Sequence, residues 1–318
     1  MSSGKGGDML LIENGYVIDP ASGRAEVADV LVDAGTIKRI APSLRKELEE
    51  AGSKIDCLDA AGSVVAPGLV DIHVHFREPG FTYKEDISSG AAVAAKGGFT
   101  TVVLMANTKP PVDNVETLCY VLDKGRQTKI HVETCANVTK GMQGKELVPM
   151  EELLQKGAVG FTDDGVPILD EGIARRAMEE AYRLGVPLSF HEENPKYIKN
   201  NGINAGRAAL HFGVDGSSRQ AEVDMVERDL RLALETGACV NIQHISSKEA
   251  VELVRQAKKQ GGNIHAEATR HHFTLTEEAL MQYGTLAKMN PPLREESDRK
   301  AILEGLHDGT IDLIATDH

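Results

Sequence analysis

The stretch Gly68-Leu-Val-Asp-Ile-His-Val-His75 opens the larger part of the chain with a short apolar run that ends in two histidines. Seven further apolar runs of similar length follow, and between them lie Ala-rich, charged segments with a helical pattern. Short apolar strands that alternate with helices predict a parallel sheet that is buried on both faces. The predicted strands are 69–73, 101–105, 129–135, 158–162, 187–191, 239–244, 263–268 and 312–316.

Eight such strand–helix units fit a (β/α)8 barrel of the TIM type, which needs about 250 residues. Several of the helical segments end at a glycine, as helix C-termini commonly do. A doubly wound open sheet is the structural alternative, but no Gly-rich phosphate loop follows the first strand. We therefore predict an α/β fold with the barrel over residues 64–318. The predicted helical segments are 84–96, 114–126, 146–156, 171–184, 222–236, 247–260 and 295–307.

The N-terminal part has a different pattern, which predicts β-structure over residues 9–65 and a short helix at 43–51. Asn14-Gly15 predicts a hairpin turn between two apolar runs, and Asp33-Ala-Gly35 predicts a second one. We expect a small N-terminal β-sandwich domain over 1–63, in which 1–8 form a polar leader. Because the sequence stops directly after the eighth predicted strand, we expect a barrel that is truncated there, with its C-terminal end incomplete.

Composition narrows the classes of function. The 318 residues include 35 Lys and Arg against 48 Asp and Glu, a net charge of −13, which argues against nucleic-acid and anionic-membrane binding. No apolar run approaches the roughly 18 residues of a membrane span, and no signal peptide is visible, so we expect a cytoplasmic protein. The four cysteines lie far apart and predict buried, reduced thiols; they are Cys57, Cys119, Cys135 and Cys239.

Side chains of the metal-binding type lie at the ends of five of the eight predicted strands. The C-terminal ends of barrel strands meet at one face, where function is located. His73 and His75 are two residues apart on a strand and therefore point the same way. A single strand-end histidine is more often a core residue, and Asp-Asp-Gly is more often a turn, so it is the coincidence of five ends that predicts a metal site. The candidates are His73, His75, Asp163, Asp164, His191, His244 and Asp317.

The motif from Gly68 to Gly80 resembles the signature of the cyclic amidohydrolases, and its His-Phe-Arg-Glu-Pro-Gly portion resembles class I dihydroorotases. The resemblance covers essentially the whole chain after residue 9. It implies a zinc-dependent enzyme that reversibly hydrolyses L-dihydroorotate to N-carbamoyl-L-aspartate by a metal-activated hydroxide, in de novo pyrimidine biosynthesis. The motifs that follow in the family's order are Asn107-Thr-Lys-Pro-Pro111, Phe161-Thr-Asp-Asp-Gly165, His191-Glu192, His244-Ile-Ser246, Asn290-Pro-Pro-Leu293 and Thr316-Asp-His318.

The same resemblance implies the roles of the site residues. It places one or two zinc ions per chain, the first held by His73, His75 and Asp317, and the second held by His191 and His244. Asp164 bridges the two ions, with Asp163 as the alternative bridge. Asp317 is also the catalytic general acid and base. Arg77 and Asn107 hold the α-carboxylate of the substrate, and Asn290 hydrogen-bonds its ring amide.

Two alternatives stay open at this point. Hydantoinases and allantoinases share the signature, but many of them bridge the metals with a carbamylated lysine, and Phe161–Gly165 contains no lysine. A catalytically inactive, dihydroorotase-like partner subunit of aspartate carbamoyltransferase is the second alternative, although such chains usually lack some of the ligands. The resemblance allows a homodimer or an association with aspartate carbamoyltransferase. Ala106 and Arg270 stand where the family commonly has proline, which puts the shapes of two loops in doubt.

Overall fold

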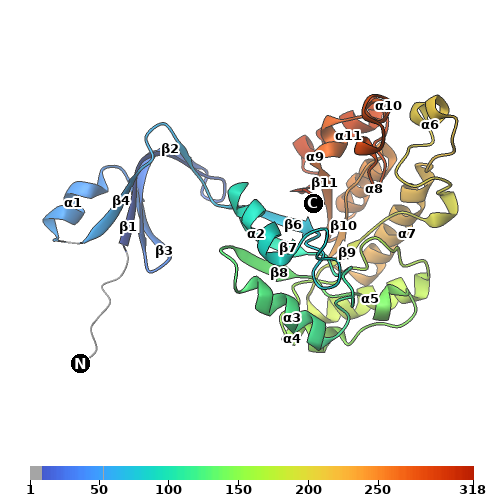
Figure 1. The fold of residues 1–318 in the computed structure, drawn as a ribbon, viewed down its shortest axis with the longest axis horizontal. Helices are drawn as coiled ribbons and strands as arrows, with labels where there is room; N and C mark the ends of the chain where they lie inside the picture. The colour runs from blue at the N-terminus through green and yellow to red at the C-terminus, as the bar shows by residue number, and fades with distance from the viewer. Residues whose placement is uncertain (1–8, 53) are drawn as a thin grey trace. The chain divides into compact units, whose positions relative to one another are not determined.

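A computed structural model describes residues 9–52 and 54–318 of the chain (Figure 1). The chain divides into two compact units, of which the first ends at Gly68 and the second begins at Leu69. The predicted leader, residues 1–8, lies outside the described residues.

The first unit contains a five-stranded mixed sheet with the strand order β3-β2-β1-β4, and β5 pairs with the second half of β1. Its small core contains Val17, Ala28 and Val30. The prediction of a β-sandwich is not met, because the described residues of this unit form one sheet and no second sheet faces it. The elements are β1 (Met9–Asp19), β2 (Arg24–Asp33), β3 (Thr36–Ala41), α1 (Leu44–Glu50), β4 (Ile55–Asp59) and β5 (Val64–Val65).

The two predicted hairpin turns have different outcomes. The predicted turn at Asn14-Gly15 is wrong, because β1 continues through this dipeptide. Only the register between β1 and β2 shifts there, as in a β-bulge. Asn14 has a φ of 61°, and a Cβ on Gly15 would lie 2.4 Å from a side-chain carbon of Val65. The second turn is confirmed: Ala34 and Gly35, both with positive φ, join β2 to β3.

The second unit contains short parallel strands surrounded by helices (Figure 1). Its strands form two sheets, one with the order β6-β7-β8 and the other with the order β12-β11-β10-β9, and every pair within them is parallel. Seven of the eight predicted strands are present: β6 (Leu69–Val74), β7 (Phe99–Leu104), β8 (His131–Thr134), β9 (Leu188–Phe190), β10 (Val240–Ile242), β11 (Ile264–Thr269) and β12 (Leu313–Ala315).

The prediction of a strand at 158–162 is wrong, because within this segment only Phe161 makes a bridge to neighbouring strand segments. Phe161 pairs in parallel with Ala136 on one side and with Leu188 on the other. Beyond it, the side chain of Asp163 takes the place of a backbone ladder, since its carboxylate accepts the backbone N–H of Val138. The described ladders therefore form two open sheets, and not the closed barrel that the sequence predicts.

Helices overlap all seven predicted helical segments, and capping residues explain several of their beginnings. The side chains of Asp86, Asn114, Asp170 and Ser247 each accept a backbone N–H of the first turn that follows. The helices are α2 (Ile87–Lys96), α3 (Val115–Gly125), α4 (Met150–Gln155), α5 (Glu171–Leu184), α6 (Arg207–Phe212), α7 (Gln220–Thr236), α8 (Lys248–Lys259), α9 (Arg270–Thr274), α10 (Glu278–Tyr283) and α11 (Glu296–Asp308), with short 3-10 turns η1 (Lys140–Met142), η2 (Pro195–Tyr197) and η3 (Gly284–Ala287).

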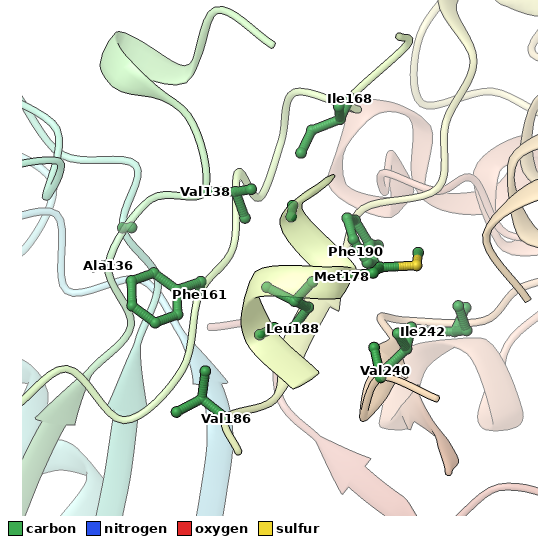
Figure 2. Packing of buried hydrophobic residues seen from close by; sticks show 14 of the residues in the cluster. Ala136, Val138, Phe161, Ile168, Met178, Val186, Leu188, Phe190, Val240 and Ile242 are labelled. Carbon is green, nitrogen blue, oxygen red and sulfur yellow. The ribbon is translucent and has the colours of Figure 1, made fainter. Parts of the chain in front are cut away.

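One large apolar core connects the strands of the second unit to their helices. Figure 2 shows Phe161 beside Ala136, and Leu188 next to Met178 of α5. All four of these side chains are fully buried. The strand ends that carry the polar motifs emerge from this close-packed core, which restrains their backbone.

The structure tests the prediction that the four cysteines are buried, reduced thiols. All four cysteines are free thiols, but the prediction that all are buried is wrong. Cys135 is buried, whereas Cys57 lies on β4, an edge strand of the first sheet, and is exposed.

Among the described helices, none combines the length and the apolar character that crossing a membrane requires.

Candidate metal centre

The two histidines that end β6 and the aspartate that follows β12 form a compact group of ligand atoms. The Nε2 atoms of His73 and His75 are 3.3 Å apart, and Oδ1 of Asp317 lies 3.4 Å and 3.0 Å from them. Backbone bonds fix this approach, because the N–H of Asp317 donates to the carbonyl of His73 and the N–H of His75 donates to the carbonyl of His318. Each of the three residues offers one ligand atom, and these atoms lie within 4.8 Å of one another.

Asp164 lies among all four histidines of the cluster. Its Oδ1 is 3.5 Å from Nε2 of His73, 3.7 Å from Nδ1 of His191 and 3.9 Å from Nε2 of His244. Its Oδ2 is 3.4 Å from Nε2 of His75, so the two oxygens face different imidazoles. The compact second group of ligand atoms is His73, Asp164 and His244, with His191 adjoining it at 2.9 Å from His244. The structure thus brings together all six residues predicted as ligands.

Asp163 has a different environment from Asp164. Its Oδ1 accepts the backbone N–H groups of Val138 and Thr139, and its Oδ2 accepts the hydroxyl of Thr139. These bonds connect the segment that follows β8 to the segment that follows Phe161. The structure therefore places Asp164, and not Asp163, among the imidazoles.

Three of the four imidazoles have an acceptor at the ring nitrogen that faces away from Asp164. The Nδ1 of His73 is 2.5 Å from Oε1 of Glu267, and the Nδ1 of His75 is 3.0 Å from Oδ1 of Asn107. The Nε2 of His191 is 3.3 Å from Oε2 of Glu193. Such acceptors place the proton on the outer nitrogen and leave the lone pair of the inner nitrogen free for a metal ion.

The carboxylates create a negative potential in the cluster that raises the pKa of two of its histidines, His73 and His191. Burial lowers the pKa of His73, but nearby carboxylates, Glu267 first among them, outweigh this effect and raise that pKa to about 10. In the same way Asp164 and Glu193 overcome the burial of His191 and raise its pKa to about 9. In the chain without a bound cation, protonated His73 and His191 therefore balance the negative charge of the carboxylates. A divalent cation would replace those protons.

The pKa values of the two aspartates shift in the opposite direction. Burial would raise the pKa of Asp164, but His73 and His75 hold it well below its usual range. Asp317 follows the same rule, since hydrogen bonding to His75 outweighs its burial and lowers its pKa. Both carboxylates are ionised at neutral pH. Four imidazoles and two carboxylates make a nitrogen and oxygen donor set that fits zinc and similar divalent ions.

Five of the six candidate ligands, all but His73, line a pocket of about 570 Å³. Arg77, Asn107 and Asn290, the predicted substrate residues, all line this pocket. The side chain of Arg77 makes no ion pair with any described residue. The two acidic residues that follow it next in the sequence are engaged elsewhere, Glu78 with Tyr120 and Glu85 with His318.

The amide of Asn107 is already engaged with the cluster: it donates to Oδ2 of Asp164, and its oxygen faces Nδ1 of His75.

Several polar residues of this region were not predicted from the sequence. Glu193, His271 and Lys288 line the pocket, and Glu267 lies behind the cluster. Glu267 had one available signal, which is a charged residue between two alanines of a predicted strand.

Comparison with known proteins extends this picture. Residues 62–250 match the model of a family described as "Dihydro-orotase-like". The chain is 55% identical over 310 residues to the dihydroorotase of Clostridioides difficile strain 630, an alignment that covers 98% of this chain and 72% of that protein. It is 51% identical over the same length to the dihydroorotase of Clostridium acetobutylicum, with the same coverage.

Solved structures of similar shape are cyclic amidohydrolases. The L-hydantoinase of Arthrobacter aurescens superposes with a TM-score of 0.82 at 23% identity, covering 98% of this chain and 69% of that one. The D-hydantoinase of a Thermus species superposes with a TM-score of 0.78 at 27% identity, covering 97% and 69%. The Arthrobacter match, at its low identity, supports the fold alone.

Proposed function

The chain belongs to the dihydroorotase family, and from that premise we propose that the cluster around Asp164 is the centre at which it interconverts L-dihydroorotate and N-carbamoyl-L-aspartate. As a dihydroorotase it is a cyclic amide hydrolase of pyrimidine synthesis. One observation carries the location of the site: beside a pocket, four imidazoles from the ends of β6, β9 and β10 face the carboxylate of Asp164, and Asp317 after β12 contacts two of them.

We propose that the two open sheets are parts of one (β/α)8 barrel. The strands follow one another in chain order and in parallel, from β6 to β8, through the bridge at Phe161, and from β9 to β12. At the remaining edge, the backbone bonds between Asp317 and His73 support contact of β12 with β6. The metal-binding side chains would then share the C-terminal face of the barrel.

We propose zinc as the ion, held by His73, His75 and Asp317 in one site and by His191 and His244 in the other, with Asp164 between them. Divalent ions bound there would polarise the substrate carbonyl and lower the pKa of a water molecule. The outer hydrogen bonds of the imidazoles support this assignment, because they orient lone pairs toward the centre of the cluster.

Arg77 and Asn290 would hold the substrate in the pocket. The guanidinium of Arg77 has no acidic partner among the described residues, which suits it to a carboxylate that it can bind with two parallel hydrogen bonds. Asn107 would contribute beside it while it holds His75. Asn290 offers an amide for the ring of dihydroorotate.

Asp317 would carry the proton. Its side chain borders the pocket, is 18% exposed, and is ionised at neutral pH because the pKa of its carboxyl lies below the usual range. It would accept a proton from the attacking water and donate it to the ring nitrogen as the carbon–nitrogen bond breaks. The second proton of the water leaves to solvent when the new carboxyl group ionises.

The alternatives are less well supported. Relatives at about 50% identity are named dihydroorotases, whereas hydantoinases and a dihydropyrimidinase of similar fold share 20–27% of their sequence with this chain. An inactive partner subunit would not need all six donors. A homodimer and an association with aspartate carbamoyltransferase stay predictions.

Purified protein loaded with zinc tests the proposal against three substrates. We expect ring opening of L-dihydroorotate at rates far above those with hydantoin or allantoin. The reverse order of rates would refute the substrate assignment, and absence of turnover in a zinc-loaded sample would favour the inactive subunit.

A further inference from the structure

Glu267 occupies an unusual position for a carboxylate. It lies in β11, between Ala266 and Ala268, and its side chain is fully buried. It does not line the pocket, so it has no access to substrate. A carboxylate in such a place is costly unless hydrogen bonds satisfy it.

The partners of Glu267 explain its burial, because both of its oxygens face groups of the metal cluster or its supporting strand. Oε1 is 2.5 Å from Nδ1 of His73 on β6, and the same oxygen accepts the backbone N–H of His244 at 3.2 Å. Oε2 accepts the side-chain amide of Asn241 on β10 at 3.4 Å. One carboxylate thus contacts two residues of the cluster that come from different strands.

Both contacts act on features that the cluster needs. His73 contributes to both compact groups of ligand atoms, so the orientation of its ring affects each of them. His244 has a φ of 32°, a left-handed conformation that is disfavoured for residues other than glycine. The bond from its N–H to Glu267 offsets part of that strain.

We propose that Glu267 is a positioning residue that fixes the proton of His73 on Nδ1 and at the same time holds the backbone of His244. Nε2 of His73 then keeps its lone pair directed toward Asp164 and Asp317. Glu267 acts only through these two residues, and this inference about its role rests on the proposed metal centre. Outer hydrogen-bond partners of metal-binding histidines commonly change metal affinity about 10- to 100-fold when they are replaced.

The substitution Glu267→Gln tests this role, since it keeps the volume and removes the charge. We expect its zinc affinity, measured by competition with a chromophoric chelator, to fall about 10- to 100-fold. Glu277→Gln is the matched control: Glu277 is also buried, but it accepts N–H groups of Asn204, Arg207 and Ala208, remote in sequence from the ligands. The control should retain the wild-type affinity for zinc even if it is less stable.

A second readout reports on the imidazole itself. In protein labelled with 15N-histidine, NMR should find the proton of His73 on Nδ1 in the zinc-loaded wild type. In Glu267→Gln this assignment should weaken or be lost. Circular dichroism establishes whether each variant is folded before its affinity is compared.

The outcomes separate this inference from the proposed function. A wild-type chain that binds no zinc would refute the metal centre itself. A wild-type chain that binds zinc, with Glu267→Gln binding it within about threefold as tightly, would refute only the role of Glu267. If Glu267→Gln does not fold, the wild-type NMR decides, because a proton on Nε2 of His73 would overturn the proposal.

Discussion

Replacing Gly90 by alanine tests how closely helix α2 packs on the histidine motif. A Cβ on Gly90 would lie 2.4 Å, 2.6 Å and 2.6 Å from three ring carbons of Phe76, well inside ordinary contact distance. Phe76 is 2% exposed and lies between His75 and Arg77 in the sequence, so its ring cannot move without pressing on the core or on the motif.

The magnitude follows from two opposed effects. Alanine in a helix interior gains about 1 kcal/mol over glycine. Overpacking of a close-packed core costs about 1–3 kcal/mol, and three contacts with a buried ring place Gly90→Ala toward the upper end of that range. We therefore expect Gly90→Ala to lower the free energy of unfolding by about 1–2 kcal/mol, whereas the helix effect alone predicts a gain.

Urea unfolding followed by circular dichroism measures this difference. Gly172→Ala in α5 is the control, since its Cβ would approach only the side chains of Asp170, at 3.1 Å, and Arg176. That variant should be as stable as wild type or slightly more stable. Because a displaced Phe76 also shifts its neighbours, we expect kcat/KM for dihydroorotate to fall in Gly90→Ala but not in the control. A Gly90→Ala protein with raised stability and unchanged kcat/KM would show that α2 does not pack tightly on Phe76.

Three further predictions concern the centre itself. Asp317→Asn should reduce turnover at least about 100-fold while most of the metal stays bound, because the amide oxygen is still a ligand but does not accept a proton at neutral pH. Dihydroorotate turnover and metal content measured on one sample check this, and unchanged turnover contradicts it. Arg77→Gln should raise KM for dihydroorotate about tenfold or more, the loss of one charge-assisted interaction, and should leave hydantoin kinetics unaffected. Zinc affinity should increase from pH 6.5 toward pH 9, since His73 and His191, with pKa values of about 10 and 9, must lose protons on binding; calorimetry in two buffers should detect that release, and a pH-independent affinity would contradict it.

Much of the second unit could be predicted because its local signals agree. Short apolar runs, helical segments and glycine ends indicate the same alternation, and seven strands lie where the pattern places them. The exception at 158–162 depends on Asp163, whose side chain replaces ladder bonds. That is a tertiary contact that no local pattern contains.

The first unit was harder to predict for a related reason. Asn14-Gly15 has the composition of a hairpin turn, but β1 pairs with β2 on both sides of the dipeptide, and the positive φ of Asn14 serves a bulge. Turn residues supply an unusual backbone conformation, and the partner strands determine whether it becomes a turn or a bulge.

The clustering of the candidate ligands could be predicted from the sequence because the C-terminal ends of parallel strands lie together. Their supporting residues could not. Glu267 occupies a strand position where a charged residue ordinarily indicates a solvent-facing side chain, and only the contact with His73, 194 residues away, reveals its burial. Glu193 was hidden in the same way, next to the more conspicuous His191.

Anomalous diffraction at the zinc absorption edge, on crystals of the zinc-loaded protein, would locate the metal ions of the proposed centre. We expect two peaks inside the pocket, one contacted by His73, His75 and Asp317 and the other by His191 and His244, with Asp164 between them. Absence of a peak among these residues, or zinc held only elsewhere on the chain, would contradict the proposed centre.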